Sequence, residues 1–583
     1  MPEAPRAALV RRLASFAALT LVLAPRVVGC ARATSPTDTT TDIAVDLPMD
    51  REVSIDSRRE ALADASHVDV PPETTDAAPD AVDAVDVIEC GPFYATEFVA
   101  GGVDRTVPRP LTPSFGAVST SHRPVLRWRP GDGSTGTRIE LCADRECATA
   151  IQTIDATGES IRLATPLLPG IVFWRLRALT TGGPGTRTSA TWHIIIGARD
   201  APLASSWGIS SDFNGDGLAD VCVGRDGYRT CFDGTRSETG ILPGVTWRPT
   251  SGQLVDLMPI TPAGDVWGDG FADVIEQLRS FDPEWRIVTA VGSRDGINGF
   301  LLNLSFSHSA PAIGQPTGAL GDIDQDGYSD IVTWSRAVPP RAEIVHGPRQ
   351  GVVPIDTDVV LGPFLTEGGA DFDADGRADF VIARSRTVCP ACRTFATFHL
   401  GSECGPVRIA GHRFVVDQSR DDVYVSVGGD VNGDGRSDAV VSIDGTASIG
   451  VYFGTPFGLS ASPGVTLSTP EPSTEGLAAI ARDVDGDGYS DVVAVARTAM
   501  GLLRIDMFRG AADGPGARVF STRLDRVDTG LVPARISAIG DCNGDRRDDF
   551  VVFYRHPVAR DFVAFLYVGS DDGPRAGLEL QTP

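Results

Sequence analysis

The sequence contains no lysine, so all 51 positions counted as Lys or Arg hold arginine. This absence excludes enzyme classes whose chemistry needs a lysine, such as P-loop NTPases, protein kinases and Schiff-base enzymes. Acidic residues number 77, which gives a formal net charge of -26. So negative a chain is not expected to bind nucleic acid or an anionic membrane through a general electrostatic field.

Motifs of the common catalytic sites are also missing. The eight histidines form no HExxH or other two-histidine spacing, and neither a GxSxG elbow nor a phosphate-binding glycine loop occurs. His346, His399 and His556 fall on or near predicted outer strands, where we expect ordinary, partly buried side chains. The sequence therefore predicts a protein that is not an enzyme.

Long hydrophobic runs are missing everywhere except near the N-terminus, at residues 13–24. About a dozen apolar residues behind an arginine-rich start are too few to span a bilayer but typical of a signal peptide. The run leads to the sequence VVGC at residues 27–30, which resembles the bacterial lipobox. Residues 1–30 are therefore predicted to be a lipoprotein signal peptide, with Cys30 as the lipidated residue. The proline and arginine just before VVGC depart from that pattern, and an ordinary secretory signal is the alternative.

Residues 31–90 are predicted to form a disordered acidic tether. The segment carries 15 acidic residues against four arginines, a net charge of about -11, and shows no helical or strand periodicity. Such a segment cannot bury enough apolar surface to offset its ordering entropy, and its like charges keep it extended.

The ten cysteines include close pairs, which favour disulfides in an exported protein. Two pairs would each close a short loop: Cys142 with Cys147, and Cys222 with Cys231. Cys389 and Cys392 form a CxxC motif, where we expect a loop disulfide with Cys404 as a competing partner. A redox site or half of a zinc site is the alternative, but neither a βαβ pattern nor a second CxxC accompanies the motif.

Residues 91–200 are predicted to form a small β-sandwich. Short alternating apolar stretches, such as residues 137–142 and 171–179, recur between Gly- and Pro-rich turns over about 90 residues. With Trp128 on an early strand and Trp174 on an aromatic strand near the end, the segment resembles a fibronectin type III domain. Both tryptophans are expected in its core.

One acidic motif of the form D-x-[DN]-x-D-G-x-x-D recurs seven times in the rest of the chain. The copies begin 49–59 residues apart, at Asp212, Asp265, Asp322, Asp371, Asp430, Asp483 and Asp541. An apolar strand follows each copy, as at residues 491–495. Near-even repetition of this kind indicates a series of similar structural units.

The motif has the chemistry of a calcium site. Oxygen side chains at positions 1, 3, 5 and 9 are ligands that calcium prefers, and the glycine at position 6 permits the sharp turn between them. Flanking strands and an aspartate at position 9 distinguish it from the helix-flanked EF-hand. Asp-Gly turns without metal are the alternative. Such turns do not explain why the same spacing of side-chain oxygens recurs seven times.

The predicted ligands of the seven loops are Asp212, Asn214, Asp216 and Asp220; Asp265, Asp269 and Asp273; Asp322, Asp324, Asp326 and Asp330; Asp371, Asp373, Asp375 and Asp379; Asp430, Asn432, Asp434 and Asp438; Asp483, Asp485, Asp487 and Asp491; and Asp541, Asn543, Asp545 and Asp549. Two loops depart from the motif, because Trp267 replaces a ligand and Arg546 replaces the turn glycine. We expect these two loops to bind metal weakly or not at all.

A second pattern, G-x-x-x-G after an apolar strand, follows each acidic motif by about 20–35 residues. Its clear copies begin at Gly292, Gly347, Gly401, Gly454, Gly510 and Gly569, with a looser version near Gly234. Each unit then reads as four short strands in about 55 residues, which is typical of a propeller blade.

On these motifs, residues 201–583 resemble the FG-GAP/VCBS repeats of integrin α-chain-like β-propellers. The resemblance implies an all-β fold, a seven-bladed β-propeller preceded by the small fibronectin type III-like β-sandwich. It also implies calcium between the first two strands of a blade, and binding rather than catalysis. The integrin's partner chain and membrane helix have no counterpart in the sequence, so its ligand specificity does not carry over.

We therefore expect an exported, lipid-anchored protein of the outer membrane or cell surface that mediates adhesion or binds an extracellular carbohydrate or protein. Calcium is expected to be structural, the N-terminal lipid the only membrane contact, and the chain a monomer that binds no nucleic acid. A secreted or periplasmic location is the alternative. The alternative functions are a propeller enzyme acting on polysaccharide and a passive scaffold in the cell envelope.

Overall fold

The computed structural model describes residues within 104–580, all of them in the unit Val85–Pro583. Outside the description, within that span, are residues 226–227, 238–239, 248–259, 280–283, 310–317, 336–340, 348–351, 355–363, 385–393, 404, 417–422, 444–445, 470–474, 498–502, 517, 525–530, 556–561 and 576. The described residues form strands and turns and contain no helix. Accordingly, none of these residues forms a helix able to cross a membrane.

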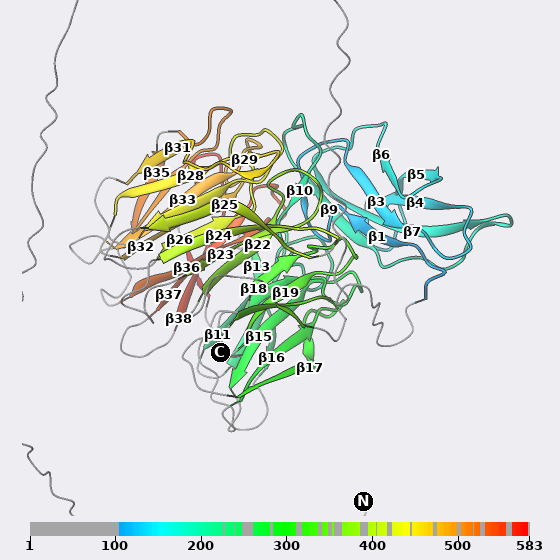
Figure 1. The fold of residues 1–583 in the computed structure, drawn as a ribbon, viewed down its shortest axis with the longest axis horizontal. Helices are drawn as coiled ribbons and strands as arrows, with labels where there is room; N and C mark the ends of the chain where they lie inside the picture. The colour runs from blue at the N-terminus through cyan, green and yellow to red at the C-terminus, as the bar shows by residue number, and fades with distance from the viewer. Residues whose placement is uncertain are drawn as a thin grey trace, which may run out of the picture. The chain divides into compact units, whose positions relative to one another are not determined.

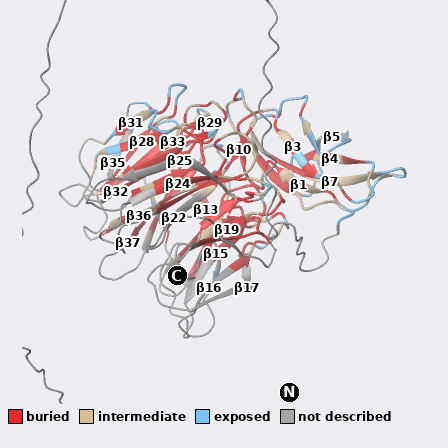
Figure 2. Cartoon of the chain, viewed as in Figure 1, coloured by how far each residue is buried: buried red, intermediate tan, exposed pale blue. Residues whose placement is uncertain are grey.

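Two sheets at the start of the described chain enclose one core. The first has the order β1 (Arg109–Thr112), β3 (Val125–Arg129), β6 (Ser160–Arg162). The second has the order β10 (Ser206–Trp207), β2 (Val118–Ser119), β9 (Trp192–Ile196), β7 (Gly170–Thr180), β4 (Gly136–Cys142), β5 (Ala150–Ala156), with β8 (Gly183–Pro184) beside β7. Trp128 and Trp174, one from each sheet, are fully buried in this core, which confirms their predicted role. Strand β5 at the sheet edge is largely exposed (Figure 2).

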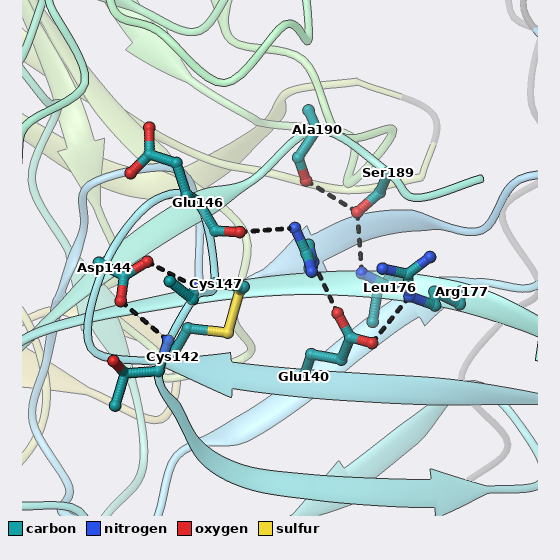
Figure 3. The surroundings of a disulfide bond; sticks show 12 residues. Glu140, Cys142, Asp144, Glu146, Cys147, Leu176, Arg177, Ser189 and Ala190 are labelled. Carbon is teal, nitrogen blue, oxygen red and sulfur yellow. Dashed lines mark hydrogen bonds and ion pairs between the residues drawn. A yellow bond between two sulfur atoms is a disulfide. The ribbon is translucent and has the colours of Figure 1, made fainter. Parts of the chain in front are cut away.

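A disulfide between Cys142 and Cys147 closes the turn that follows β4 (Figure 3). Within that turn the Asp144 carboxylate accepts the N–H groups of Ala148 and Thr149, at 2.7 and 3.0 Å. The turn is therefore fixed both covalently and by hydrogen bonds to its backbone.

Within the described residues, seven larger antiparallel sheets follow in chain order, which gives a propeller-like succession (Figure 1). The described part of the first has three strands, β11 (Val221–Arg225), β12 (Tyr228–Gly234) and β13 (Ile241–Trp247). The second to fourth sheets are β14 (Thr261–Gly264), β15 (Asp273–Arg279), β16 (Glu284–Val291), β17 (Asn298–Ser309); β18 (Gly318–Gly321), β19 (Asp330–Ser335), β20 (Arg341–Val345), β21 (Val352–Pro354); and β22 (Phe364–Ala370), β23 (Asp379–Arg384), β24 (Thr394–Leu400), β25 (Val407–Val416).

The last three sheets also have four strands each. They are β26 (Val423–Val427), β27 (Ala439–Ile443), β28 (Ser448–Tyr452), β31 (Val465–Ser468); β32 (Glu475–Arg482), β33 (Asp491–Arg497), β34 (Leu503–Phe508), β35 (Arg518–Leu524); and β36 (Val532–Gly540), β37 (Asp549–Arg555), β38 (Phe562–Tyr567), β39 (Leu578–Leu580). A small hairpin, β29 (Gly454–Thr455) with β30 (Gly458–Leu459), interrupts the fifth sheet.

Each inner sheet packs on both of its faces, which explains why its strands are apolar at consecutive positions. Along β33, Val492 belongs to the core shared with the fifth sheet, whereas Val493 belongs to the core shared with the seventh. Successive side chains of a strand point to opposite faces, so a strand covered on both sides needs apolar residues throughout. The stretch Asp491–Arg497 is buried apart from its last residue.

The acidic loops join neighbouring sheets in a closed circuit, which we call the loop ring. In every loop the N–H of the eighth residue donates to the carbonyl oxygen of the first residue of the preceding loop, at 2.8–3.0 Å. The donors are Ala272, Ser329, Ala378, Ser437, Ser490 and Asp548, and Ala219 of the first loop donates to Asp541 of the last. This last bond closes the ring between the two ends of the repeat region.

The first unit differs from the predicted pattern of four strands. Before Asp212, the segment Ser206–Trp207 pairs with β2 of the sandwich instead of with β11. The next residue, Gly208, donates its N–H to the Gly369 carbonyl at 2.7 Å, on the innermost strand of the fourth sheet. The linker between sandwich and repeats is thus hydrogen-bonded to both.

Candidate metal centres and a polar cavity

The ninth aspartate of each loop holds the loop backbone. In the fourth loop Asp379 accepts the N–H of Phe372 at 2.6 Å through one oxygen and the N–H of Gly401 at 2.9 Å through the other. The glycine donors in the seven units are Gly234, Gly292, Gly347, Gly401, Gly454, Gly510 and Gly569, at 2.7–3.2 Å. These glycines are the first residues of the second sequence pattern, so the two repeats meet at this aspartate.

The first aspartate of each loop closes the turn. In the fifth loop Asp430 accepts the N–H of Gly433 at 2.6 Å and that of Gly435 at 2.8 Å. Gly435 has a φ of 90°, a conformation that side chains rarely adopt. In the seventh loop Arg546 takes this place with a φ of 70° and still donates its N–H to Asp541 at 2.8 Å. The seventh loop therefore keeps the fold of the motif at the cost of backbone strain.

Three loops bring three carboxylates together, with oxygens within 4.8 Å of one another. These groups are Asp322, Asp324 and Asp326; Asp371, Asp373 and Asp379; and Asp483, Asp485 and Asp491. They belong to the three loops in which all four predicted ligands are aspartates. These acidic clusters have the composition and spacing of metal sites.

The other loops keep the same turn with different donors. The side-chain oxygens of Asn214, Asn432 and Asn543 each accept the N–H of the residue two positions on, at 2.8–3.0 Å. Trp267 offers no such oxygen, and its backbone N–H donates to Asp273 at 3.2 Å. The second loop, with Asp265 and Asp269, therefore folds like the others but has one ligand fewer.

The fourth loop shows why a cation fits. Asp371 is buried, and among the described residues its Oδ1 has no hydrogen-bond partner. Burial, together with the charges of Asp375 and Asp373, raises the pKa of Asp371 to about 8 despite the hydrogen bond from Ser205. In the sixth loop, burial and the charges of Asp548 and Asp487 raise the pKa of Asp483 to about 8. A bound cation would remove this cost by pairing with the ionised carboxylates.

One histidine that the sequence analysis expected to be an ordinary side chain joins the third loop. His346 Nδ1 lies 3.1 Å from Asp330 Oδ1 and 3.4 Å from Asp324 Oδ2. Its side chain is almost completely buried, so the expectation of a partly buried residue on an outer strand was wrong. His399 is also buried, and stacks on Phe380, whereas His556 lies outside the described residues. Only the position of His346 directly before Gly347 could have indicated its role.

A cavity of about 860 Å³ lies between the sandwich and the first, fifth, sixth and seventh loops. Its charged lining comprises Arg199, Asp212, Asp216, Arg236, Asp430, Arg482, Asp483, Asp541, Asp545, Arg546, Arg547 and Asp548. His193 of the sandwich also lines it, with Nδ1 3.4 Å from Asp212 Oδ2, and burial lowers the pKa of His193 to about 3. A neutral imidazole and a mixed set of charges thus face one space.

Two arginines of this cavity stand where other units have glycine. Arg482 has a φ of 63° at the position before the first aspartate, which is Gly264 or Gly321 in other units. Arg546, with its φ of 70°, occupies the turn position. Non-glycine residues in this region are strained, and such strain concentrates at functional sites. Two of the departures from the repeat, Arg482 and Arg546, therefore line the cavity.

The space at the centre of the sheets is small. It measures about 110 Å³ and is lined by inner-strand residues such as Ala319, Ser426 and Ile536. Arg482 extends into it and donates to the Ile209 carbonyl at 3.1 Å. The volume suits about three or four water molecules of ~30 Å³ each.

The cysteines fall into three groups. Cys142 pairs with Cys147, and Cys222 pairs with Cys231 across β11 and β12. Cys542 is buried and has a free thiol. The predicted sites Cys30, Cys389 and Cys392 lie outside the described residues.

No protein-family model matches the chain. No curated protein matches it either. Among solved structures, a protein from Lactobacillus plantarum is 12% identical with a TM-score of 0.34, over 52% of this chain and 79% of that one. The WD40 domain of Toxoplasma gondii coronin is 10% identical with a TM-score of 0.31, over 56% and 73%. A puromycin hydrolase is 16% identical with a TM-score of 0.28, over 67% and 58%. Similarities this low carry no argument about the fold or the function of this chain.

Proposed function

We propose that residues 201–583 form a seven-bladed, calcium-binding propeller of the FG-GAP/VCBS type on an exported, lipid-anchored protein. The proposed role is to bind an extracellular carbohydrate or protein, without turnover. The observation that carries the proposal is the loop ring, in which seven acidic loops repeat one hydrogen-bond pattern and the last joins the first. Metal ions in such a ring would stabilise every junction between neighbouring sheets.

The sandwich fits a fibronectin type III-like domain. The strand orders β1-β3-β6 in one sheet and β5-β4-β7-β9 in the other support this reading, with β2 and β10 extending the second sheet beyond β9. Such a domain supports a binding role, because it holds one wall of the cavity against the loops.

The cavity is the proposed ligand site. Calcium in the first, fifth and sixth loops would pair with Asp212, Asp430 and Asp483, so that five arginines of the lining would face four other carboxylates. The ligand would then be a polar group that carries negative charge, such as an acidic sugar or an acidic peptide segment. The strained Arg546, which is exposed, is the side chain best placed to meet it.

A screen of glycans and proteins with the purified chain tests this function. We expect calcium-dependent binding of an acidic ligand that Arg546→Ser weakens about tenfold or more, with no cleavage of that ligand. Glu159→Gln, an exposed change in the sandwich turn before β6, serves as the control. Cleavage of a polysaccharide would instead support the enzyme alternative, and no binding at all would support the scaffold.

The anchor is tested separately. Labelled fatty acid should be incorporated into the wild-type protein in bacterial cells, and Cys30→Ser should abolish both the labelling and the membrane association. Release of unlabelled wild-type protein into the medium would contradict the lipoprotein assignment.

A further inference from the structure

The residue before the glycine that caps each ninth aspartate reaches the metal loop in at least two units. In the seven units this residue is Asp233, Val291, His346, Leu400, Phe453, Arg509 and Val568. The position therefore supplies a carboxylate, an imidazole, a guanidinium or an apolar group. In the sixth unit the Arg509 guanidinium forms an ion pair with Asp485, the third residue of its loop. In the third unit His346 reaches Asp324, the residue at the same loop position.

The third loop thereby gains a nitrogen ligand. His346 Nδ1, Asp324 and Asp330 place one ligand atom each within 4.8 Å of one another, and all three side chains are nearly buried. Two of these distances, 3.1 Å to Asp330 Oδ1 and 3.4 Å to Asp324 Oδ2, match ligand pairs around a small ion. Two ligands that each lie about 2.05 Å from one metal, at 90–109° to each other, are about 2.9–3.4 Å apart.

The fourth loop provides an internal reference. It has the same four aspartates as the third, Asp371 among them, but Leu400 takes the place of His346. Calcium binds through oxygen ligands at longer distances, whereas imidazole suits zinc, cobalt, nickel and iron. The two loops therefore offer the same carboxylates to different classes of ion.

We propose that the third loop is a mixed site for a first-row transition-metal ion, bound by His346, Asp324 and Asp330, while the fourth loop takes calcium. Asp322 and Asp326, whose carboxylates group with that of Asp324, complete its oxygen ligands. The inference rests on the proposed function in one respect, that these loops bind metal. It adds that one loop of the ring selects a different ion.

Cobalt(II) is the probe, because its visible spectrum and its effect on proton NMR both report the ligands. Metal-depleted full-length protein, titrated with cobalt in excess calcium, should bind one equivalent with a new absorption band. A paramagnetically shifted, solvent-exchangeable imidazole N–H resonance should appear with it. His346→Leu, which copies the fourth loop, should lower the cobalt affinity at least tenfold and remove the shifted resonance.

Two controls keep the result interpretable. Leu400→Met, at the equivalent position of the fourth loop, should leave cobalt binding unchanged. Calcium stoichiometry of His346→Leu should equal that of the wild type, which shows that the variant is folded. Zinc should displace the cobalt with one-to-one stoichiometry.

The possible failures are distinct. Equal cobalt affinity in the wild type and His346→Leu, or displacement of cobalt by millimolar calcium, would overturn this inference and leave the calcium propeller intact. Binding of neither cobalt nor calcium to the wild type would overturn the proposed function together with it.

Discussion

At the scale of single residues, the aspartates of one loop differ in how much the backbone needs them. Asp379 accepts backbone N–H groups through both oxygens and is fully buried. Asp375, in the same loop, is partly exposed and accepts one backbone N–H, from Arg377 at 2.8 Å. The ninth aspartate is therefore required by the fold in addition to any role as a metal ligand, whereas the fifth contributes little to the backbone.

This difference predicts two kinds of variant. Asp379→Asn places an NH2 group against buried N–H donors, so we expect a loss of about 2–3 kcal/mol in unfolding free energy with or without calcium. Asp375→Asn should leave the metal-free stability nearly unchanged and reduce the gain on adding calcium. Denaturant unfolding of both variants, in calcium and in EDTA, measures the two effects. Equal calcium dependence in Asp375→Asn and the wild type would contradict the ligand role.

The sequence predicted where the acidic turns lie, because the motif is local, and the metal-ligand role of their side chains stays a prediction. It predicted the loop register, the two departures at Trp267 and Arg546, and the buried tryptophans of the sandwich. It did not predict His346 beside Asp330, because that contact joins two strands of one sheet across 16 residues. Nor did it predict that Arg482 would reach the centre of the sheets.

At the scale of elements, neighbouring sheets are joined through the backbone of their loops. Ala378 donates its N–H to the Asp322 carbonyl at 3.0 Å, and serine occupies the same position in three other loops. In the fifth loop the serine adds a side-chain contact, since Ser437 Oγ accepts the Asp371 N–H at 2.9 Å. The hydrogen bond needs only the backbone N–H, which both Ala and Ser provide.

Proline at this position should therefore break one junction of the loop ring. Ala378→Pro removes the donor and leaves a buried carbonyl unpaired, so we expect a loss of about 2–3 kcal/mol or more. Ala378→Ser keeps the donor and should be nearly neutral. Thermal and denaturant unfolding of the two variants provide the comparison, and equal stability of both would show that the junction contributes little.

Strand positions were predictable within a few residues, because four-strand units with apolar runs repeat at even spacing. The stretch Asp491–Arg497, for example, was expected and found as a strand. The first unit was not predictable in the same way, since Ser206–Trp207 pairs with the sandwich, a contact between parts of the chain 87 residues apart. Long-range pairing of a single short strand leaves no periodic signal in the sequence.

At the scale of the whole molecule, the buried carboxylates make the metal-free protein sensitive to pH. Burial, with neighbouring negative charges, raises the pKa of Asp265, Asp371 and Asp483 to about 8 and that of Asp212 to about 7. In the unfolded chain an aspartate has a pKa of about 3.9. Between about pH 4 and 8 the folded, metal-free chain therefore binds more protons than the unfolded chain.

The sign of the effect follows from this difference. Stability falls with rising pH wherever the folded state binds more protons, so the Tm in EDTA should decrease from pH 5 to pH 8. In saturating calcium the carboxylates are ionised and paired with the metal. The Tm in calcium should therefore exceed the Tm in EDTA by a margin that widens from pH 5 to pH 8. A metal-free Tm that stays level or rises toward pH 8 would contradict the burial of these groups beside one another.

The central claim is that the loop ring binds calcium, and calorimetric titration of the metal-depleted protein with calcium tests it most directly. Five loops keep all four oxygen ligands, the third among them when no transition metal is present, so we predict about five calcium ions per chain. Each site would add about 2.7 kcal/mol of stability at 100 times its Kd, and the Tm should rise accordingly over that in EDTA. No heat of binding and an unchanged Tm would mean that the acidic loops are turns alone, and would contradict this account.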